Sequence, residues 1–252
     1  MTRKLQTDSP VASKVFPSPN HGERKNGCPP DMIILHYTGM ADAGEALQRL
    51  CNPVAEVSAH YFIFEDGRVL QLVPEARRAW HAGVSSWAGE TDINSRSIGI
   101  EIANPGHEGG LPPFPEQQIN AVIALCRDIA ERWKIKPERI LAHSDIAPGR
   151  KVDPGERFPW QKLHEHDVGH WIPAVEASHG RSFSLGEEGI SVEALQAMLS
   201  LYGYQADISG KFDERTEAVV AAFQRHFRQS RVDGVADSST VATLHNLLKS
   251  VS

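Results

Sequence analysis

The sequence predicts an α/β unit with a central mixed β-sheet flanked by helices, followed by a small all-α unit of three helices. Short apolar runs rich in strand-forming residues, with one long amphipathic helix before the last of them, predict the first unit. Three apolar stripes at helical spacing, beginning after residue 186, predict the second. We expect an N-terminal arm at 1–29, the α/β unit at 30–172, a linker at 173–186 and the three-helix unit at 187–250.

Composition restricts the class of protein. A chain of 252 residues accommodates one medium domain and a small module, and 40% hydrophobic with 23% charged residues is typical of a globular protein. A net charge of −6 argues against nucleic acid as the main partner. No segment has the length and hydrophobicity of a membrane span. The three cysteines are widely spaced, which fits neither a disulfide framework nor a C-x-x-C zinc site.

The strands of the first unit are indicated by apolar runs. The first run, 32–39, contains His36 and is too short for a helix. A helix follows at 43–50, and two strands at 59–64 and 69–73 flank an Asp-Gly turn typical of a hairpin. In a strand at 97–104 the isoleucines face the core, and Glu101 faces the other way between Gly99 and Ala103.

The clearest helix is predicted at 115–133, where apolar residues recur at helical spacing and include Cys126 as a small core residue. It returns the chain to an apolar strand at 140–142, which leads to His143. The following segment, to residue 155, reads as a loop stiffened by two prolines and bent at Gly149 and Gly155.

Within this loop Lys151 and Asp153 stand two residues apart, so in an extended segment both side chains leave on one side. With His143 they form a hydrolytic metal site that lacks one ligand, and His36 is the candidate for it. Two His and one Asp leave a fourth position for water, as at catalytic zinc. The alternative is that each His caps a strand or bonds a carbonyl.

Other polar residues have more than one interpretation. Glu101 suits the general base for a metal-activated water, or is a surface residue. Trp80 and His81 suit the wall of a sugar- or peptide-binding groove, or pack within a loop. We expect His60 to be hydrogen-bonded beneath the site rather than to be a ligand. His164, His166 and His170 fit a solvated helix end.

Five segments resemble a known family, the type 2, AmpD-like zinc amidases (N-acetylmuramoyl-L-alanine amidases), which are related in fold to peptidoglycan recognition proteins. The segments are 34–38, 57–61, 78–83, 97–101 and 143–155, within about 30–172. The resemblance implies one zinc ion per chain, held by His36, His143 and Asp153. It also implies Glu101 as the catalytic carboxylate and Lys151 as the stabiliser of the oxyanion. We further expect Trp80, His81, Asn104 and Arg150 to contact substrate.

The C-terminal stripes are preceded by turns that place Asp213 and Asp237 at helix N-caps. A plain three-helix bundle is one interpretation. The segments around 195–204 and 210–224 are, however, similar to the peptidoglycan-binding domain 1 family over about 187–249. No catalytic candidate lies beyond Asp153, so a chain ending near Ser178 is expected to fold and keep its activity on a small substrate.

Together these features predict hydrolysis of the amide between N-acetylmuramic acid and L-alanine in peptidoglycan or muropeptides. A non-catalytic wall-binding protein would lack a ligand or the Glu, an Fe(II) oxygenase would need a jelly roll, and a glycosidase would need two carboxylates without metal. The N-terminus shows no secretory signal, which predicts a cytoplasmic location. The wall-binding module suggests the alternative, a periplasmic one. The sequence leaves the oligomeric state open.

Overall fold

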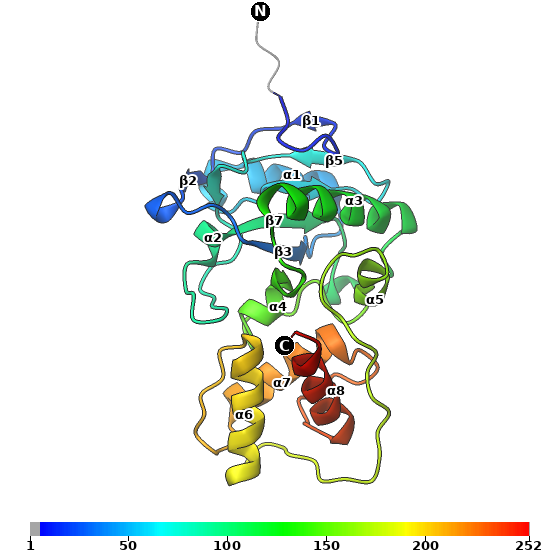
Figure 1. Ribbon diagram of the computed structural model, residues 1–252. Helices are drawn as coiled ribbons and strands as arrows, with labels where there is room; N and C mark the ends of the chain where they lie inside the picture. Colours follow the sequence, from blue (N-terminus) through cyan, green and yellow to red (C-terminus); the bar gives the residue numbers. More distant parts are fainter. Residues whose placement is uncertain (1–5, 252) are drawn as a thin grey trace, which may run out of the picture.

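Residues 6–251 are described by a computed structural model, shown in Figure 1. A six-stranded sheet has the order β1-β5-β4-β7-β3-β8, and a separate two-stranded sheet pairs β2 with β6. Only the β4–β5 pair of the large sheet is antiparallel, so the sheet is mixed, as predicted. The strands are β1 Lys14–Val15, β2 His21–Glu23, β3 Met32–Tyr37, β4 Tyr61–Ile63, β5 Val69–Gln71, β6 Arg77–Ala79, β7 Ser97–Ile102 and β8 Ile140–Ala142.

Helices cover both faces of the large sheet. In this unit the α-helices are α1 Ala43–Cys51, α2 Ile93–Arg96, α3 Glu116–Trp133, α4 His143–Ile146 and α5 Trp160–His164, and the 3-10 helices are η1 Lys25–Gly27, η2 Pro53–Ala55, η3 His107–Gly109 and η4 Pro137–Arg139. The amphipathic helix predicted at 115–133 is therefore confirmed as α3. It buries its apolar side, including Cys126, against one face of the strands.

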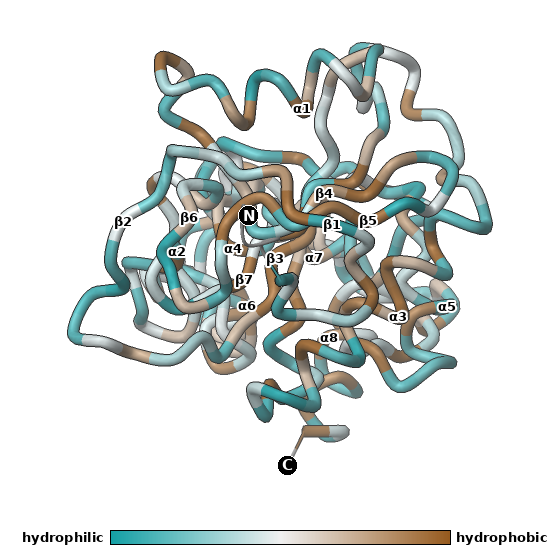
Figure 2. The backbone as a smooth tube through the Cα atoms, turned by 90° about the horizontal axis from the view of Figure 1, so that it is seen from above, coloured by the Kyte–Doolittle hydropathy of each residue, from teal (hydrophilic) through white to brown (hydrophobic). Residues whose placement is uncertain are grey.

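The strand register decides which side chains share a face. In β3, Ile33 and Leu35 face α3, while Ile34 and His36 face the opposite way beside Gly99 and Glu101 of β7. The expected alternation along 97–104 is thus confirmed. Figure 2 shows the central strands as hydrophobic, which follows from their burial on both faces.

The N-terminal arm is more regular than expected. Its β1 extends the large sheet beside β5, and its β2 pairs with β6, so the arm supplies two short edge strands. These strands could not be predicted from the sequence, because two or three residues are too few to show periodicity. Residues 1–5 of the predicted arm lie outside the described residues.

The C-terminal unit contains the three predicted helices, α6 Ile190–Tyr202, α7 Glu214–Phe227 and α8 Ser238–Ser250. Asp213 and Asp237 are the N-caps of α7 and α8, and each accepts a hydrogen bond from the backbone N–H three residues on. Both caps agree with the sequence prediction. No helix in the described part of the chain is both long and apolar enough to cross a membrane.

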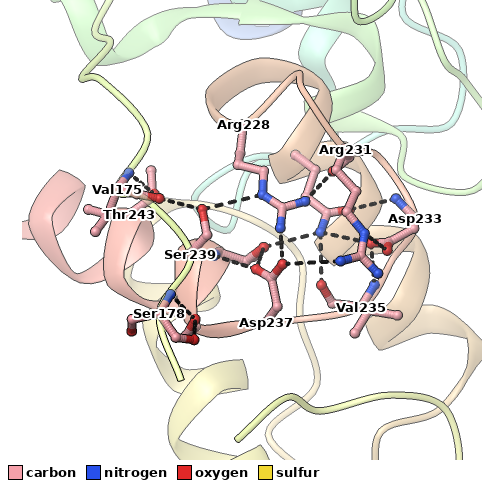
Figure 3. A network of polar contacts seen from close by, with 12 residues as sticks. Val175, Ser178, Arg228, Arg231, Asp233, Val235, Asp237, Ser239 and Thr243 are labelled. Carbon is pink, nitrogen blue, oxygen red and sulfur yellow. Dashed lines mark hydrogen bonds and ion pairs between the residues drawn. The ribbon is translucent and has the colours of Figure 1, made fainter. Parts of the chain in front are cut away.

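A polar network fastens the segment before α6 onto α8, as Figure 3 shows. Buried Arg228 pairs with Asp237, and its Nε also donates to Ser239 Oγ. Ser239 Oγ in turn donates to the carbonyl of Val175, and Ser238 Oγ to that of Ser178. The segment predicted as a linker therefore lies along α8 for part of its length.

One apolar core crosses the boundary between the two units. Met32, Ile34 and Leu141 of the sheet belong to the same buried cluster as the inward side chains of α6, α7 and α8. The turn at Gly149 lies against α7, where a Cβ would be 3.2 Å from Ala218 Cβ. In Figure 1, α4 lies between the sheet and the three helices. The helical unit is thus packed on the α/β unit rather than merely tethered to it.

Candidate metal centre and active site

Three buried side chains converge at the carboxyl end of the sheet. His36 Nδ1 lies 2.9 Å from His143 Nδ1 and 3.1 Å from Asp153 Oδ2. His143 Nδ1 lies 2.9 Å from the same Asp153 oxygen. These are the three ligand candidates expected from the sequence, and the structure brings them together as a group that could hold a metal ion.

Parallel pairing of β3 with β8 explains why the histidines meet. Leu35 is paired with Ala142, so the next residues along the two strands, His36 and His143, leave the sheet side by side. The segment after His143 was expected to be a loop. It begins instead as the short helix α4, whose Ser144 N–H donates to the Asp153 carbonyl at 3.0 Å. This bond brings Asp153 back beside His143.

Hydrogen bonds to the far ring nitrogens leave both Nδ1 lone pairs facing the group. His143 Nε2 lies 3.1 Å from the Ala82 carbonyl, which can only accept, and 3.4 Å from a guanidinium nitrogen of Arg150, which can only donate; the shorter contact favours a ring proton on Nε2. The Ser97 hydroxyl donates to the Ile93 carbonyl, so it accepts from His81 Nε2 at 3.2 Å. His81 Nδ1 then accepts from His36 Nε2 at 3.1 Å. Such partners of the far nitrogen are usual for metal-binding histidines.

The charges of the group are those of a cation site. Burial, together with the neighbouring His143, lowers the pKa of His36 to about 4. Burial alone would raise the pKa of Asp153, but the two imidazoles outweigh it and hold that pKa below its ordinary value. At neutral pH the group therefore offers a neutral His36 imidazole and the Asp153 carboxylate, with His143 beside them.

Glu101 lies beside His36 in the register of β3 and β7. Its Oε2 is enclosed and has no hydrogen-bond partner among the described residues. Burial and the nearby Asp153 carboxylate outweigh the opposing charge of Lys151 and raise the pKa of the Glu101 carboxyl to about 8. A buried oxygen without a partner is uncommon and marks a place where a further polar group fits.

Glu101 and the three converging residues open into one cavity of about 490 Å³. Lys151, Trp80 and His81 also line it. Within residues 6–251 the Lys151 ammonium has no carboxylate within ion-pair distance. Two further residues expected to contact substrate are not in the lining. The Asn104 amide accepts a hydrogen bond from the Gly106 N–H and donates one to the Pro112 carbonyl, within its own loop. The Arg150 guanidinium donates to the carbonyls of Ala82 and Val84.

His60 lies beneath the cavity, next to the lining residue His81. The space that a side chain at Gly99 would take is filled by the His81 ring, 2.4 Å from where a Cβ would stand. His60 Nδ1 accepts from the Gly99 N–H at 2.9 Å, and its Nε2 lies 3.0 Å from the Arg77 carbonyl. His60 is thus hydrogen-bonded beneath the site, as predicted.

Part of the cavity wall comes from residues that were not expected from the sequence. The cavity is also lined by Met40, which precedes α1, and by Arg49 in the last turn of α1. Neither carries a motif, because α1 reaches the site only through its packing on Phe62, Leu70 and Leu72. His170, by contrast, bonds Tyr202 and Ser250 far from the converging residues.

Residues 26–156 match the family model described as N-acetylmuramoyl-L-alanine amidase. The chain belongs to this family. Residues 188–244 match a peptidoglycan binding domain model. The amidase is 38% identical over 231 residues to the N-acetylmuramoyl-L-alanine amidase AmiD of Escherichia coli, across 86% of this chain and 82% of that protein. It therefore hydrolyses the amide bond between N-acetylmuramic acid and L-alanine.

Solved structures support the same assignment. The amidase superposes on E. coli AmiD, in complex with anhydro-N-acetylmuramic acid-L-Ala-D-gamma-Glu-L-Lys, with a TM-score of 0.75 and 36% identity, covering 90% of this chain and 91% of that one. AmpDh3 of Pseudomonas aeruginosa gives a TM-score of 0.73 and 31% identity over 90% of this chain and 94% of its own. AmpD of Enterobacter cloacae is 32% identical over 61% of this chain and 89% of its own length.

Proposed function

We propose that the amidase is zinc-dependent, with one zinc ion per chain held by His36, His143 and Asp153. The observation that carries the proposal is the mutual distance of 2.9 to 3.1 Å among the three donor atoms, whose lone pairs face one another. Ligand atoms around tetrahedral zinc, with bonds of about 2.0–2.1 Å, lie about 3.3 Å apart, so small side-chain rotations suffice. Two imidazoles and a carboxylate leave the fourth position for the reaction.

When bound, zinc supplies Lewis acidity, which acidifies water and polarises the scissile carbonyl. Glu101 takes the proton of the attacking water and passes it to the leaving L-alanine amine. Its raised pKa suits both roles, since a carboxyl that titrates near neutral pH can accept and return a proton. The Lys151 ammonium stabilises the negative charge that develops on the carbonyl oxygen. Trp80 lines the groove that receives the substrate.

Metal analysis of Asp153→Ala tests the ligand set. We expect wild-type protein to contain close to one zinc per chain and Asp153→Ala to lose most of it together with activity, while the circular dichroism spectrum is retained. Asp66→Ala is the matched control, because Asp66 is an exposed carboxylate that pairs with Arg68 in a turn. Zinc near one per chain in Asp153→Ala would exclude Asp153 as a ligand.

We also propose that the amidase accepts 1,6-anhydro-muropeptides and that the three-helix unit, 187–250, retains it on peptidoglycan. The first part rests on the ligand named in the AmiD complex, the second on the match at residues 188–244. A bound module raises the local substrate concentration for the catalytic unit. Mass analysis of products from purified sacculi and from soluble anhydro-muropeptide tests both parts. Preference for the soluble fragment fits the cytoplasmic alternative, and turnover of sacculi fits the periplasmic one.

A further inference from the structure

Asp145 connects the metal centre to the three-helix unit. It lies two residues after His143, is fully buried, and accepts three hydrogen bonds. The Ala142 N–H donates to its Oδ2 at 2.8 Å, the Tyr204 hydroxyl to its Oδ1 at 2.7 Å, and His226 Nδ1 to its Oδ2 at 2.7 Å. Two of the three donors therefore come from the C-terminal unit.

The turn that carries Asp145 sets the position of two proposed ligands. His143 is the first residue of α4, and Ser144 N–H holds the carbonyl of Asp153. The bond from Ala142 to Asp145 closes the N-terminal end of this turn. A shift of the Asp145 carboxylate would thus move the backbone that orients both His143 and Asp153.

The two donors from the C-terminal unit are themselves held rigidly. The His226 ring is stacked on the Trp160 ring, with 3.7 Å between the ring centroids, and on the Phe227 ring, with 4.0 Å. Its Nε2 has no hydrogen-bond partner among residues 6–251, so its one polar contact there is with Asp145. Tyr204 is buried and packs edge-on against Trp87 at 4.9 Å. Neither side chain can follow Asp145 if the carboxylate moves.

We propose that Tyr204 and His226 are positioning residues for the metal centre, acting through Asp145 on the α4 turn. The three-helix unit then has a second role beside wall binding, which is to fix the geometry of the catalytic unit. This inference rests on the proposed metal role of His143 and Asp153. Loss of a partner in the outer shell of a metal site typically costs about 10- to 100-fold in affinity or activity.

Tyr204→Phe in the full chain is the first test, since it removes only the hydroxyl. Tyr202→Phe is the matched control, because the Tyr202 hydroxyl bonds His170 instead of Asp145. Zinc affinity is measured by chelator competition, and ligand geometry by the visible absorption of the cobalt-substituted protein. We expect Tyr204→Phe to weaken zinc binding about 10-fold and to alter the cobalt spectrum. Tyr202→Phe should match the wild type in both measurements.

A pair of substitutions at position 226 tests the hydrogen bond separately from packing. His226→Asn keeps an N–H that can reach Asp145, whereas His226→Leu keeps bulk without a donor. We expect the Asn variant to bind zinc more tightly than the Leu variant. If Tyr204→Phe and His226→Leu retain wild-type zinc affinity and cobalt spectrum, even with a lowered unfolding midpoint, the network only stabilises the fold and the inference is wrong.

The proposed function fails in a different way. Wild-type protein without bound zinc, or a His143→Ala variant that binds zinc as tightly as the wild type, would overturn the ligand assignment itself. Wild-type zinc binding together with its loss in His143→Ala upholds that assignment, whatever the variants at positions 204 and 226 do.

Discussion

At the scale of single residues, the surroundings of a side chain decide what its chemistry can be. Glu101 and Asp153 are both carboxylates at one cavity, yet their pKa values move apart. Oε2 of Glu101 is enclosed and has no hydrogen-bond partner within residues 6–251, so burial favours the neutral form of this carboxyl. Asp153 faces two imidazoles, which favour its charged form. One carboxyl is thereby suited to proton transfer and the other to holding a cation.

Replacement of Glu101 by glutamine separates catalysis from metal binding. We expect Glu101→Gln to keep its zinc and to lose about 10²- to 10⁴-fold in kcat, the usual contribution of a positioned general base. Steady-state kinetics on a soluble muropeptide, with metal analysis of the same sample, provide the measurement. A rate near that of the wild type would assign the base role to another residue.

His60 makes stability depend on pH. Burial, together with the positive charge of Arg24, lowers its pKa from 6.5 in the unfolded chain to about 3 in the fold. Between these values the unfolded chain binds a proton that the folded one does not, so the free energy of unfolding falls as the pH falls. The loss is roughly 1.4 kcal/mol per pH unit for one such group.

The variant His60→Asn tests how much His60 contributes to the pH dependence of the free energy of unfolding. Asparagine can still accept the Gly99 N–H, so we expect a folded protein that is less stable at pH 8 but loses less stability between pH 6.5 and 4. Urea unfolding midpoints of both proteins across this range are the measurement. Parallel pH dependence of the two proteins would assign the effect to other groups.

At the scale of elements, the site depends on parallel strands that end at one edge of the sheet. β3, β7 and β8 bring His36, Glu101 and His143 together because residues in register leave on the same face. Short side chains beneath that edge then decide which other side chains can pack against His36. Gly99 of β7 is the clearest example, since the His81 ring occupies the place of its missing Cβ.

We expect Gly99→Ala to displace His81 and, through it, His36. Overpacking of this kind costs about 1–3 kcal/mol in stability, and the lost support should also weaken zinc binding. Gly22→Ala in β2 is the control, because nothing lies within 4 Å of a Cβ there. Thermal unfolding and zinc titration are the measurements. A Gly99→Ala protein that matches the Gly22→Ala protein in both would refute the role of His81.

At the scale of the whole molecule, the two units share buried apolar surface. Trp87, Leu141 and Ile146 of the α/β unit pack in the same cluster as Leu195 and Phe223 of the helical unit. The face beneath α4 is therefore apolar and covered.

The structure therefore changes the expectation for a chain ending at Ser178. Several side chains, each worth about 1.5–3 kcal/mol on burial, would become exposed. At about 2–4 °C per kcal/mol, we expect the midpoint of thermal unfolding to fall by roughly 10 °C or more. Activity on a soluble anhydro-muropeptide should fall with it. An unchanged midpoint with full activity would instead support the separable units expected from the sequence.

The sequence by itself determined the longer elements and the metal-binding candidates. The helix at 115–133, the N-caps Asp213 and Asp237, and the runs that end at His36 and His143 are local patterns, and local propensity and capping act over a few residues. Asp153 was a candidate because it stands two residues after Lys151 in the loop that follows His143, and the family resemblance implied the same role. The two short edge strands of the arm could not be, since β1 and β2 form only through their pairing with β5 and β6.

Only the tertiary structure decided which residues support the site. The His81 ring under Gly99 and the bonds of Tyr204 and His226 to Asp145 join positions far apart along the chain. Asn104 and Arg150 lie close in sequence to Glu101 and Lys151. Their side chains nevertheless donate hydrogen bonds to backbone carbonyls and are not part of the cavity lining. Such contacts depend on how faces pack, and packing involves the whole chain, whereas a sequence pattern reports only its own segment.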